Sequence, residues 1–233
     1  MSDRLNQVTA AILMGGLGTR LRPVAPEYQK TVMPVAGQPF VMRLLDQLAD
    51  AGLRHVVLCT GYKAKQVESL IGNHHRCLSI AYSQETSPLG TAGALRNALP
   101  LLDSNPVLAL NGDSYCELDL AAFHAAHGRR NATLAVTEVA DTSRFGRVAF
   151  DKHGVISGFI EKGDATGTGW INAGVYLMGR ALLESIPTGR AVSIEREIFP
   201  AWIGRDLYAF RTCGKFVDIG TPDSYAVAQN FFS

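Results

Sequence analysis

The chain has 233 residues, of which 47% are hydrophobic, so it can bury one full α/β core without a linker. Its 22 basic and 21 acidic residues leave a net charge of +1, which excludes a global field that attracts nucleic acid or an anionic membrane. The 4 cysteines lack CxxC spacing and no apolar stretch reaches membrane-spanning length, so we expect a soluble protein of the reducing cytoplasm.

The first predicted element is a short buried strand over the apolar run Val8 to Met14. The run breaks into a glycine-rich turn, where missing Cβ atoms permit positive φ and let an anion approach the backbone N–H groups. A hydroxyl and several cations follow the glycines, against a single acid, Glu27. The residues concerned are Gly15, Gly16, Gly18, Thr19, Arg20, Arg22 and Lys30. This combination indicates a receptor for a polyphosphate.

Two commoner glycine loops do not fit this stretch. A Rossmann dinucleotide loop needs a third glycine at position 21, where the chain has Leu21, and the Gly-Lys-Ser/Thr of a Walker loop is absent. A tight strand-to-helix turn with solvated arginines is the plainer alternative. Ordinary turns, however, seldom need both the glycines and the charge.

Strands then alternate with helices as far as residue 139. Phe40, Leu44 and Leu48 repeat at helical spacing, and Gly52 stands where a glycine cap would end that helix. Further helices are predicted over Ala64–Ile71, Thr91–Leu99 and Leu118–His127, and strands over His55–Thr60, Leu78–Tyr82, Val107–Leu110 and Ala132–Val139. This order predicts parallel βαβ units with both sheet faces covered, and ligands of such sheets bind at the carboxyl ends of the strands.

Beyond residue 140 the pattern changes to an antiparallel hairpin. Its two strands, Arg147–Asp151 and Val155–Glu161, flank a DKHG turn. The later predicted elements are a strand over Ile171–Met178, a helix after Ser193, strands over Leu207–Thr212 and Lys215–Ile219, and a last helix capped by Thr221 with Pro222 in its first turn.

Two aspartates end apolar runs far apart in the chain. Asp113 follows Val107–Leu110, and Asp218 follows Phe216 and Val217. Two hard oxygen ligands at the ligand-binding edge of a sheet suit Mg²⁺ that bridges the phosphates of a nucleotide. An aspartate at a strand end also serves as a turn or cap residue, and spacing alone does not separate these interpretations.

The histidines carry less information. His124 and His127 share a helical face, and His74 and His75 are adjacent, but no third ligand is placed for either pair. We therefore expect surface or capping roles for them.

The loop resembles the GxGTRLxP…K signature of the sugar-1-phosphate nucleotidyltransferases, a family to which several further segments are similar. The matching loop residues are Gly16, Gly18, Thr19, Arg20, Leu21, Pro23 and Lys30. The family's usual proline before the lysine is Gln29 in this chain. The segments SQETSPLGTAGAL, LNGDS, FIEKG, INAGVY and VDIGTP also match, in the order of the family. The resemblance implies an α/β, Rossmann-like three-layer fold of the GT-A-like kind, with a mixed, mostly parallel central sheet.

The resemblance also implies roles for individual residues. Catalysis falls to Arg20, Lys30 and Asp113, with Mg²⁺ as cofactor on Asp113 and Asp218. The nucleotide-binding residues implied are Leu13, Gly15, Gly16, Gly18, Thr19, Glu85, Gly90 and Thr91. The sugar-phosphate-binding residues implied are Gly112, Glu161, Lys162, Asn172 and Gly174. The whole chain, 1–233, would then be a single catalytic domain, with a nucleotide-binding part over about 1–140 and a sugar-phosphate-binding part over about 141–233.

The reaction implied is transfer of a nucleoside monophosphate from a nucleoside triphosphate to a sugar 1-phosphate, with release of pyrophosphate. The short length and the segments PLGTAGAL, SRFG and EKG are most similar to family members that act on D-glycero-α-D-manno-heptose 1-phosphate. Mannose-1-phosphate guanylyltransferases come next, with uridylyl and thymidylyl transfer behind them. A catalytically silent subunit that binds nucleotide sugar is the alternative outside enzymes, and a homo-oligomer is compatible with the sequence.

Glu85 lies in the segment that resembles the base pocket of the family, and its chemistry favours guanine. The Watson-Crick edge of guanine presents N–H donors, and an ionised carboxylate only accepts. Uracil and thymine would oppose carbonyl oxygens to that carboxylate. We therefore expect GTP as the nucleotide substrate.

Overall fold

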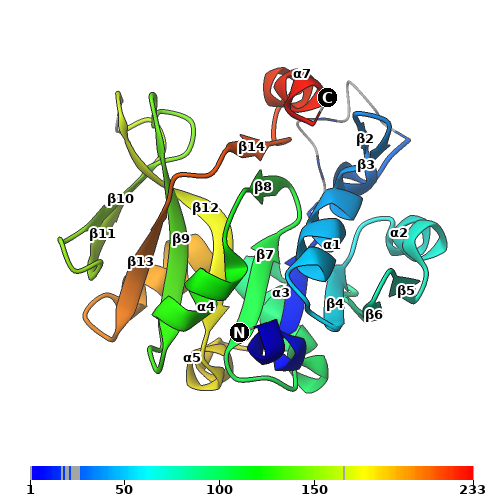
Figure 1. Ribbon diagram of the computed structural model, residues 1–233, viewed down its shortest axis with the longest axis horizontal. Helices are drawn as coiled ribbons and strands as arrows, with labels where there is room; N and C mark the ends of the chain where they lie inside the picture. Colours follow the sequence, from blue (N-terminus) through cyan, green and yellow to red (C-terminus); the bar gives the residue numbers. More distant parts are fainter. Residues whose placement is uncertain (1, 17, 19–20, 22–26, 165, 233) are drawn as a thin grey trace.

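A computed structural model describes residues 2–16, 18, 21, 27–164 and 166–232 of the chain (Figure 1). An eight-stranded sheet with the order β13-β9-β12-β7-β1-β4-β6-β5 runs through it. The strands are β1 (Thr9–Leu13), β4 (His55–Thr60), β5 (His74–His75), β6 (Leu78–Gln84), β7 (Val107–Asn111), β9 (Ala132–Val139), β12 (Gly169–Met178) and β13 (Leu207–Thr212). β12 and β5 run antiparallel to their neighbours and the other pairings are parallel. The predicted mixed, mostly parallel sheet is confirmed.

Helices cover both faces of the sheet, as the βαβ alternation predicted. Along β1 the side chains alternate between the two faces of the sheet, so that Ala10 and Ile12 belong to one core and Ala11 to the other. The first core packs against α1 (Phe40–Asp50), α2 (Ala64–Ile71), α4 (Leu120–His127) and α7 (Pro222–Phe231). The second packs against α3 (Gly90–Ala98), α5 (Arg180–Ser185) and α6 (Phe199–Trp202). The result is a three-layer α/β domain.

β9 runs parallel to β7, as the βαβ alternation predicts, but the two strands are not neighbours. β12 lies between them and runs antiparallel to both. β12 is ten residues long and mostly buried, as a central strand of a covered sheet is. Its pairing with β9 shifts register between Asn172 and Tyr176, where Gly174 adopts a φ of 75° that favours glycine.

Local capping explains where the helices begin and end. α1 closes with Gly52 at φ 90°, whose N–H binds Ala49 O while Leu53 N–H binds Leu48 O, a Schellman cap as predicted. α4 begins at Leu120 rather than at the predicted Leu118, because the Asp119 side chain accepts from Ala122 N–H.

The last two helices predicted from the sequence have different outcomes in the structure. Thr221 and Ser224 form a capping box at the start of α7, with Pro222 in the first turn as predicted. After Ser193 the chain forms a π-helical turn, η4 (Ile194–Ile198), before α6, rather than one α-helix.

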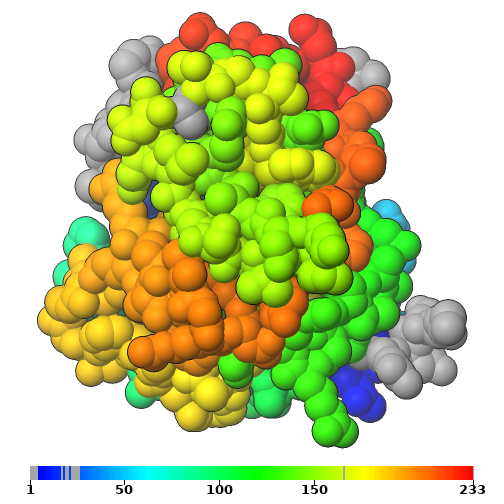
Figure 2. Space-filling model, turned by 90° about the vertical axis from the view of Figure 1, so that its left-hand side faces the viewer, coloured from blue at the N-terminus to red at the C-terminus, as the bar shows by residue number. Residues whose placement is uncertain are grey.

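Three small sheets accompany the large one among the described residues. β2 (Pro34–Val35) pairs with β3 (Gln38–Pro39), β8 (Ser114–Cys116) pairs with β14 (Phe216–Asp218), and β10 (Arg147–Phe150) pairs with β11 (Ile156–Ile160) as the predicted hairpin. Figure 2 shows the yellow-green hairpin against the orange segment that contains β13. There the Ala209 N–H donates to Gly154 O at 2.7 Å. No helix in the described part of the chain is both long and apolar enough to cross a membrane.

His127 is not a surface residue, so this part of the prediction was wrong. Its side chain is 2% exposed, and Nδ1 lies 2.9 Å from the Thr133 hydroxyl. Burial, together with the smaller effects of the nearby His124 and Arg130, lowers the pKa of His127 to about 4. His127 thus lies against β9, the strand that contains Thr133, whereas His124 is only half-buried.

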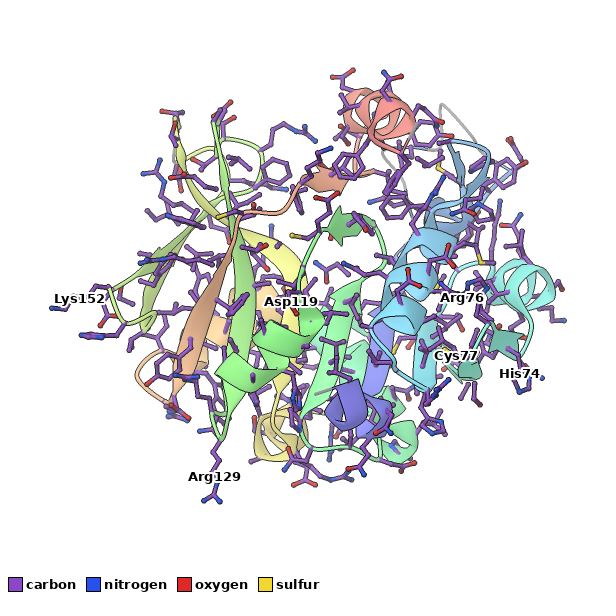
Figure 3. All side chains as sticks on the ribbon, viewed as in Figure 1. His74, Arg76, Cys77, Asp119, Arg129 and Lys152 are labelled. Atoms are coloured by element: carbon purple, nitrogen blue, oxygen red, sulfur yellow. The ribbon has the colours of Figure 1, made fainter. Side chains whose placement is uncertain are left out.

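We predict that this histidine makes stability depend on pH. Its folded pKa lies below its unfolded value, so its stabilising effect is full above about pH 6.5 and is lost as the pH falls towards 4. The shift corresponds to a loss of about 3 kcal/mol in the free energy of unfolding. Urea unfolding of wild type and His127→Gln between pH 7 and pH 4 measures it, with the exposed His74→Gln as control (Figure 3). Equal slopes for wild type and His127→Gln would contradict the assignment.

Candidate active site

A cavity of about 360 Å³ opens where the carboxyl ends of β1 and β7 lie side by side. Residues predicted from the sequence form much of its wall. They are Leu13, Gly15, Gly16, Lys30, Glu85, Gly90, Thr91 and Asp113. The cavity therefore gathers parts of the glycine loop, the base segment and the first aspartate, which lie as much as 100 residues apart.

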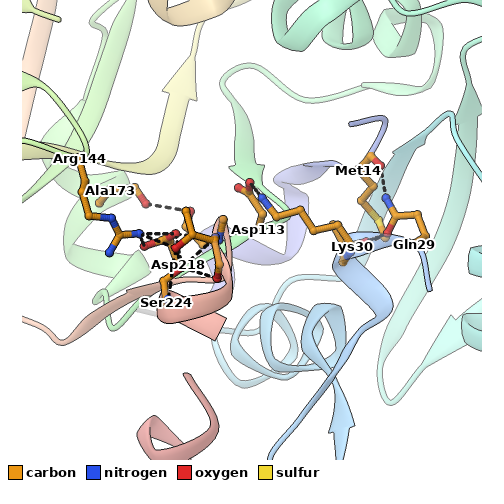
Figure 4. Close-up of polar contacts among 12 residues, drawn as sticks. Met14, Gln29, Lys30, Asp113, Arg144, Ala173, Asp218 and Ser224 are labelled. Carbon is orange, nitrogen blue, oxygen red and sulfur yellow. Dashed lines mark hydrogen bonds and ion pairs between the residues drawn. The ribbon is translucent and has the colours of Figure 1, made fainter. Parts of the chain in front are cut away.

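Lys30 and Asp113 form an ion pair at this cavity (Figure 4). Lys30 stands in the 3-10 turn η2 (Lys30–Val32) and its side chain is 11% exposed, whereas that of Asp113 is 41% exposed. The Gly112 N–H donates to Leu13 O at 2.9 Å and joins the end of β7 to the end of β1. A Cβ on Gly112 would lie 2.6 Å from that oxygen, so only glycine permits the approach. The pair places a fixed cation and an accessible carboxylate together.

Glu85 follows β6 and lies between two glycines. A Cβ on Gly15 would overlap its carboxylate, and one on Gly61 would lie 2.6 Å from Oε1. Oε2 accepts from Leu89 N–H at 3.0 Å. Burial raises the pKa of Glu85, and the Leu89 N–H partly opposes the rise. This acid is thus packed against the glycine loop and is not a freely solvated loop residue.

Asp218 approaches Asp113 through the pairing of β8 with β14. Ile219 N–H donates to Asp113 O at 2.9 Å, so the two aspartates belong to hydrogen-bonded segments. The Asp218 carboxylate binds Arg144 Nη2 at 3.2 Å and accepts from the Ser224 hydroxyl at 2.9 Å (Figure 4).

The chemistry of this donor set fits Mg²⁺. Asp113 and Asp218 are hard oxygen donors, and each already attracts a cationic side chain, Lys30 and Arg144 respectively. Among the described residues no three His, Cys, Asp or Glu side chains gather as a complete metal cage. A magnesium ion here would therefore take its remaining ligands from water and substrate phosphates, as Mg²⁺ commonly does.

The residues predicted for the sugar phosphate divide into two groups. Asn172 donates from Nδ2 to the Tyr176 hydroxyl at 2.8 Å and accepts from Gly174 N–H at 2.9 Å. A Cβ on Gly174 would meet the Ser114 hydroxyl at 2.6 Å, so this part of β12 packs beside the strand end that carries Asp113.

The second group lies outside the cavity wall. Glu161 and Lys162 follow β11 and are exposed, and Glu161 makes a 3.7 Å ion pair with the exposed Arg196. Asn172, Gly174 and Gly112 also lie outside the cavity wall, so none of the residues predicted for the sugar phosphate lines it. Gly18 and Asp218 lie outside the wall as well. Arg20 and Thr19, predicted for catalysis and nucleotide binding, lie outside the described residues.

Sequence reasoning missed several residues of the cavity wall, above all Glu195. Its Oε2 accepts from the hydroxyls of Thr91 at 3.0 Å and Ser193 at 3.2 Å, and Oε1 from that of Tyr176 at 3.4 Å. The wall also contains Met14, Gln29, Thr31, Pro88, Ala94 and Asn111. The sequence predicts Ser193 as a helix cap. The available signal was the carboxylate of Glu195 two residues after this cap, in what the structure shows to be a short, irregular helix.

Asn111 adds a polar feature to the same wall. Its Nδ2 donates to the Tyr176 hydroxyl at 3.3 Å, whereas its buried Oδ1 has no hydrogen-bond partner among the described residues. A buried acceptor of this kind is costly unless a donor reaches it. The wall can therefore accept a hydroxyl or N–H group of a ligand.

In an open α/β sheet, ligands bind at the carboxyl ends of the strands, and here that edge carries glycines, Lys30 and Asp113 around one cavity. The Nucleotidyl transferase family profile matches residues 9–233, and the chain belongs to this family.

Relatives and solved structures agree with this membership. The chain is 38% identical over 227 residues to a mannose-1-phosphate guanylyltransferase of Mycobacterium tuberculosis, covering 94% of this chain and 63% of the relative. It is 35% identical to a D-glycero-alpha-D-manno-heptose 1-phosphate guanylyltransferase of Aneurinibacillus thermoaerophilus, covering 94% and 96%. HddC of Yersinia pseudotuberculosis, solved with GMP-PN, superposes with a TM-score of 0.86 at 31% identity, covering 97% and 100%. The chain spans less than two thirds of the length of the mannose-1-phosphate relatives it matches.

Proposed function

We propose that the chain transfers a guanylyl group from GTP to a sugar 1-phosphate and releases pyrophosphate. The observation that carries this proposal is the cavity that holds Lys30, Asp113 and Glu85 together. The relatives at 35% and 38% identity, which are guanylyltransferases by name, support the same reaction. Release of pyrophosphate from GTP in the presence of a sugar 1-phosphate tests it.

The reaction needs positioning and charge neutralisation more than acid-base chemistry. An oxygen of the sugar phosphate attacks the α-phosphorus of GTP and forms a new P–O bond. The bond from the α-phosphorus to the bridging oxygen breaks, and pyrophosphate leaves with the electron pair. The nucleophile is already anionic, so no general base is required.

Lys30 and Arg20 would stabilise the charge on the phosphates, as fixed cations do for phosphoryl groups. In this proposal Lys30 holds the phosphates and Arg20 acts on the α-phosphate and the departing pyrophosphate. Asp113 and Asp218 would hold Mg²⁺, which neutralises and orients phosphate oxygens when bound. The backbone N–H groups of the glycine loop would complete the phosphate site.

For the sugar we propose D-glycero-α-D-manno-heptose 1-phosphate, so that the product would be a GDP-heptose for a surface polysaccharide. The heptose relative supports this choice because the match covers 96% of its length. Mannose 1-phosphate is the second candidate, supported by the 38% identity of those relatives. A panel of sugar 1-phosphates assayed with GTP separates the two, and wild-type protein that releases no pyrophosphate with any of them would indicate a silent binding subunit.

Lys162→Ala is expected to raise the KM for the sugar phosphate about tenfold or more, because a charge-assisted hydrogen bond contributes about 1.5–3 kcal/mol. The KM for GTP should change little, since Lys162 is assigned to one substrate only. Steady-state kinetics with each substrate varied measures the split. Lys152→Ala, in the exposed turn between β10 and β11, is the matched control (Figure 3). Equal changes in both KM values would contradict the assignment.

A further inference from the structure

Gln29 stands at the position where the resembled family has proline, and its side chain is almost completely buried, at 1% exposure. Its Nε2 donates to Met14 O, 15 residues earlier in the chain. Its Oε1 accepts from both the N–H and the hydroxyl of Thr31, each at 2.6 Å. One amide therefore joins the end of β1 to the turn that begins with Lys30 (Figure 4).

These bonds fix the backbone of Lys30 relative to that of Asp113. Gln29 fastens the lysine turn to Met14 O, and Gly112 N–H fastens the aspartate segment to Leu13 O at 2.9 Å. Both members of the ion pair are thus attached to consecutive residues at the end of one buried strand. The Lys30–Asp113 pair closes the ring through the side chains.

The backbone itself does not require glutamine at this place. Gln29 has φ −68°, which a proline ring would also adopt. Proline, however, has no N–H, and the Gln29 N–H donates to Gln66 Oε1 at 2.7 Å. The side-chain amide and this N–H are therefore the features that distinguish Gln29 from the usual residue.

We propose that Gln29 is a positioning residue for the transfer reaction, which ties the turn of Lys30 to β1 and so aims the Lys30 ammonium at the substrate phosphates. This inference rests on the proposed function. Gln29 itself contributes no charge and moves no proton. Its effect passes through Lys30, whose side chain leaves the same turn that the amide caps.

The test is a double-mutant cycle of Gln29→Met with Lys30→Met. Methionine keeps the length of glutamine and removes its polar atoms, so the tie is lost with little change in volume. In the wild-type background Gln29→Met should lower kcat between about tenfold and a hundredfold, the effect of a displacement near 1 Å, with KM for the sugar phosphate unchanged. In the Lys30→Met background the same change should have almost no effect on kcat, because the group it positions is gone.

Gln47→Met is the matched control. Gln47 also donates from Nε2 to a backbone carbonyl, that of Cys116 at 2.7 Å, but it lies on α1 outside the cavity wall. Its replacement should leave kcat within about twofold of wild type in both backgrounds, as distant sites behave independently. If Gln29→Met is poorly folded, Gln29→Glu replaces it, since glutamate keeps an acceptor for Thr31 but loses the donor to Met14 O and places a second acceptor opposite that oxygen.

The outcomes separate this inference from the proposed function. An equal loss of kcat in both backgrounds, or a Gln29→Met enzyme as fast as wild type, would overturn the positioning role while leaving guanylyl transfer intact. Wild-type protein without pyrophosphate release would overturn the proposed function itself. Wild-type activity, together with a loss of kcat that Gln29→Met causes only where Lys30 is retained, would establish Gln29 as a positioning residue.

Discussion

Asp113→Asn is expected to lower kcat about a thousandfold, the size of effect seen when a fixed charge-stabilising group is removed from a reaction centre. The amide of asparagine carries no charge, so it weakens both the hold on Mg²⁺ and the pairing with Lys30. The Asp113 side chain is 41% exposed, and the substitution preserves its shape, so the fold should remain intact. Pyrophosphate release at saturating GTP measures the change. Circular dichroism of the variant checks the fold.

Asp46→Asn is the matched control for this experiment. Asp46 also pairs with basic side chains, His75 at 2.8 Å and Arg76 at 3.6 Å, but it lies on α1 outside the cavity wall. Arg76 is visible in Figure 3 on the side of the molecule that carries β5. We expect near-normal kcat for Asp46→Asn. Near-normal kcat for Asp113→Asn as well would show that the aspartate is not part of the reaction centre.

The strand ends could be predicted from the sequence because local patterns determine them. An apolar run followed by Asn111, Gly112 and Asp113 indicates a buried strand that ends in polar groups, and parallel neighbours share that edge. The structure confirms this placement, since β1 and β7 are adjacent and parallel. The helix ends at Gly52 and Thr221 could also be predicted, because helix caps have short sequence signatures.

The side-chain partners at the same edge could not be predicted. Lys30 and Asp113 are 83 residues apart, and Arg144 and Asp218 are 74 apart, so no periodicity relates them. β12 was missed as a central antiparallel strand for a similar reason, because strand order depends on long-range packing and not on local pattern.

Gln29 and Glu195 illustrate the limit for single residues. The sequence placed Gln29 at a departure from the family motif, but its buried amide becomes informative only once Met14 and Thr31 are seen beside it. Glu195 lies in a π-helical turn, whose register differs from the 3.6-residue period used to assign helix faces. Helical periodicity therefore does not reveal which residues an irregular segment places at a binding site.

Glu85→Gln is expected to reduce the preference for GTP over UTP about a hundredfold, since hydrogen bonds to a charged group contribute about 1.5–3 kcal/mol each. The Glu85 carboxylate is packed against Gly15 and Gly61, and Leu89 N–H already binds Oε2. It is thus held as an acceptor at the cavity, where guanine would present its N1–H and amino donors. Glutamine replaces part of that acceptor by a donor, so the loss should fall mainly on GTP. The ratio of kcat/KM for the two nucleotides measures it.

The pH dependence of the same ratio provides the decisive comparison. Burial raises the pKa of Glu85 above its ordinary value, so the acceptor form exists above the raised pKa and is lost as the pH falls through it. Wild type should therefore lose its preference for GTP on acidification at a higher pH than an exposed glutamate would, whereas Glu85→Gln should show no such step. Glu184→Gln, which affects an exposed ion pair with Arg180 on α5, should behave as wild type does. A wild-type enzyme that uses UTP as well as GTP, or a Glu85→Gln variant with an unchanged nucleotide ranking, would remove the physical basis for guanine recognition by this residue.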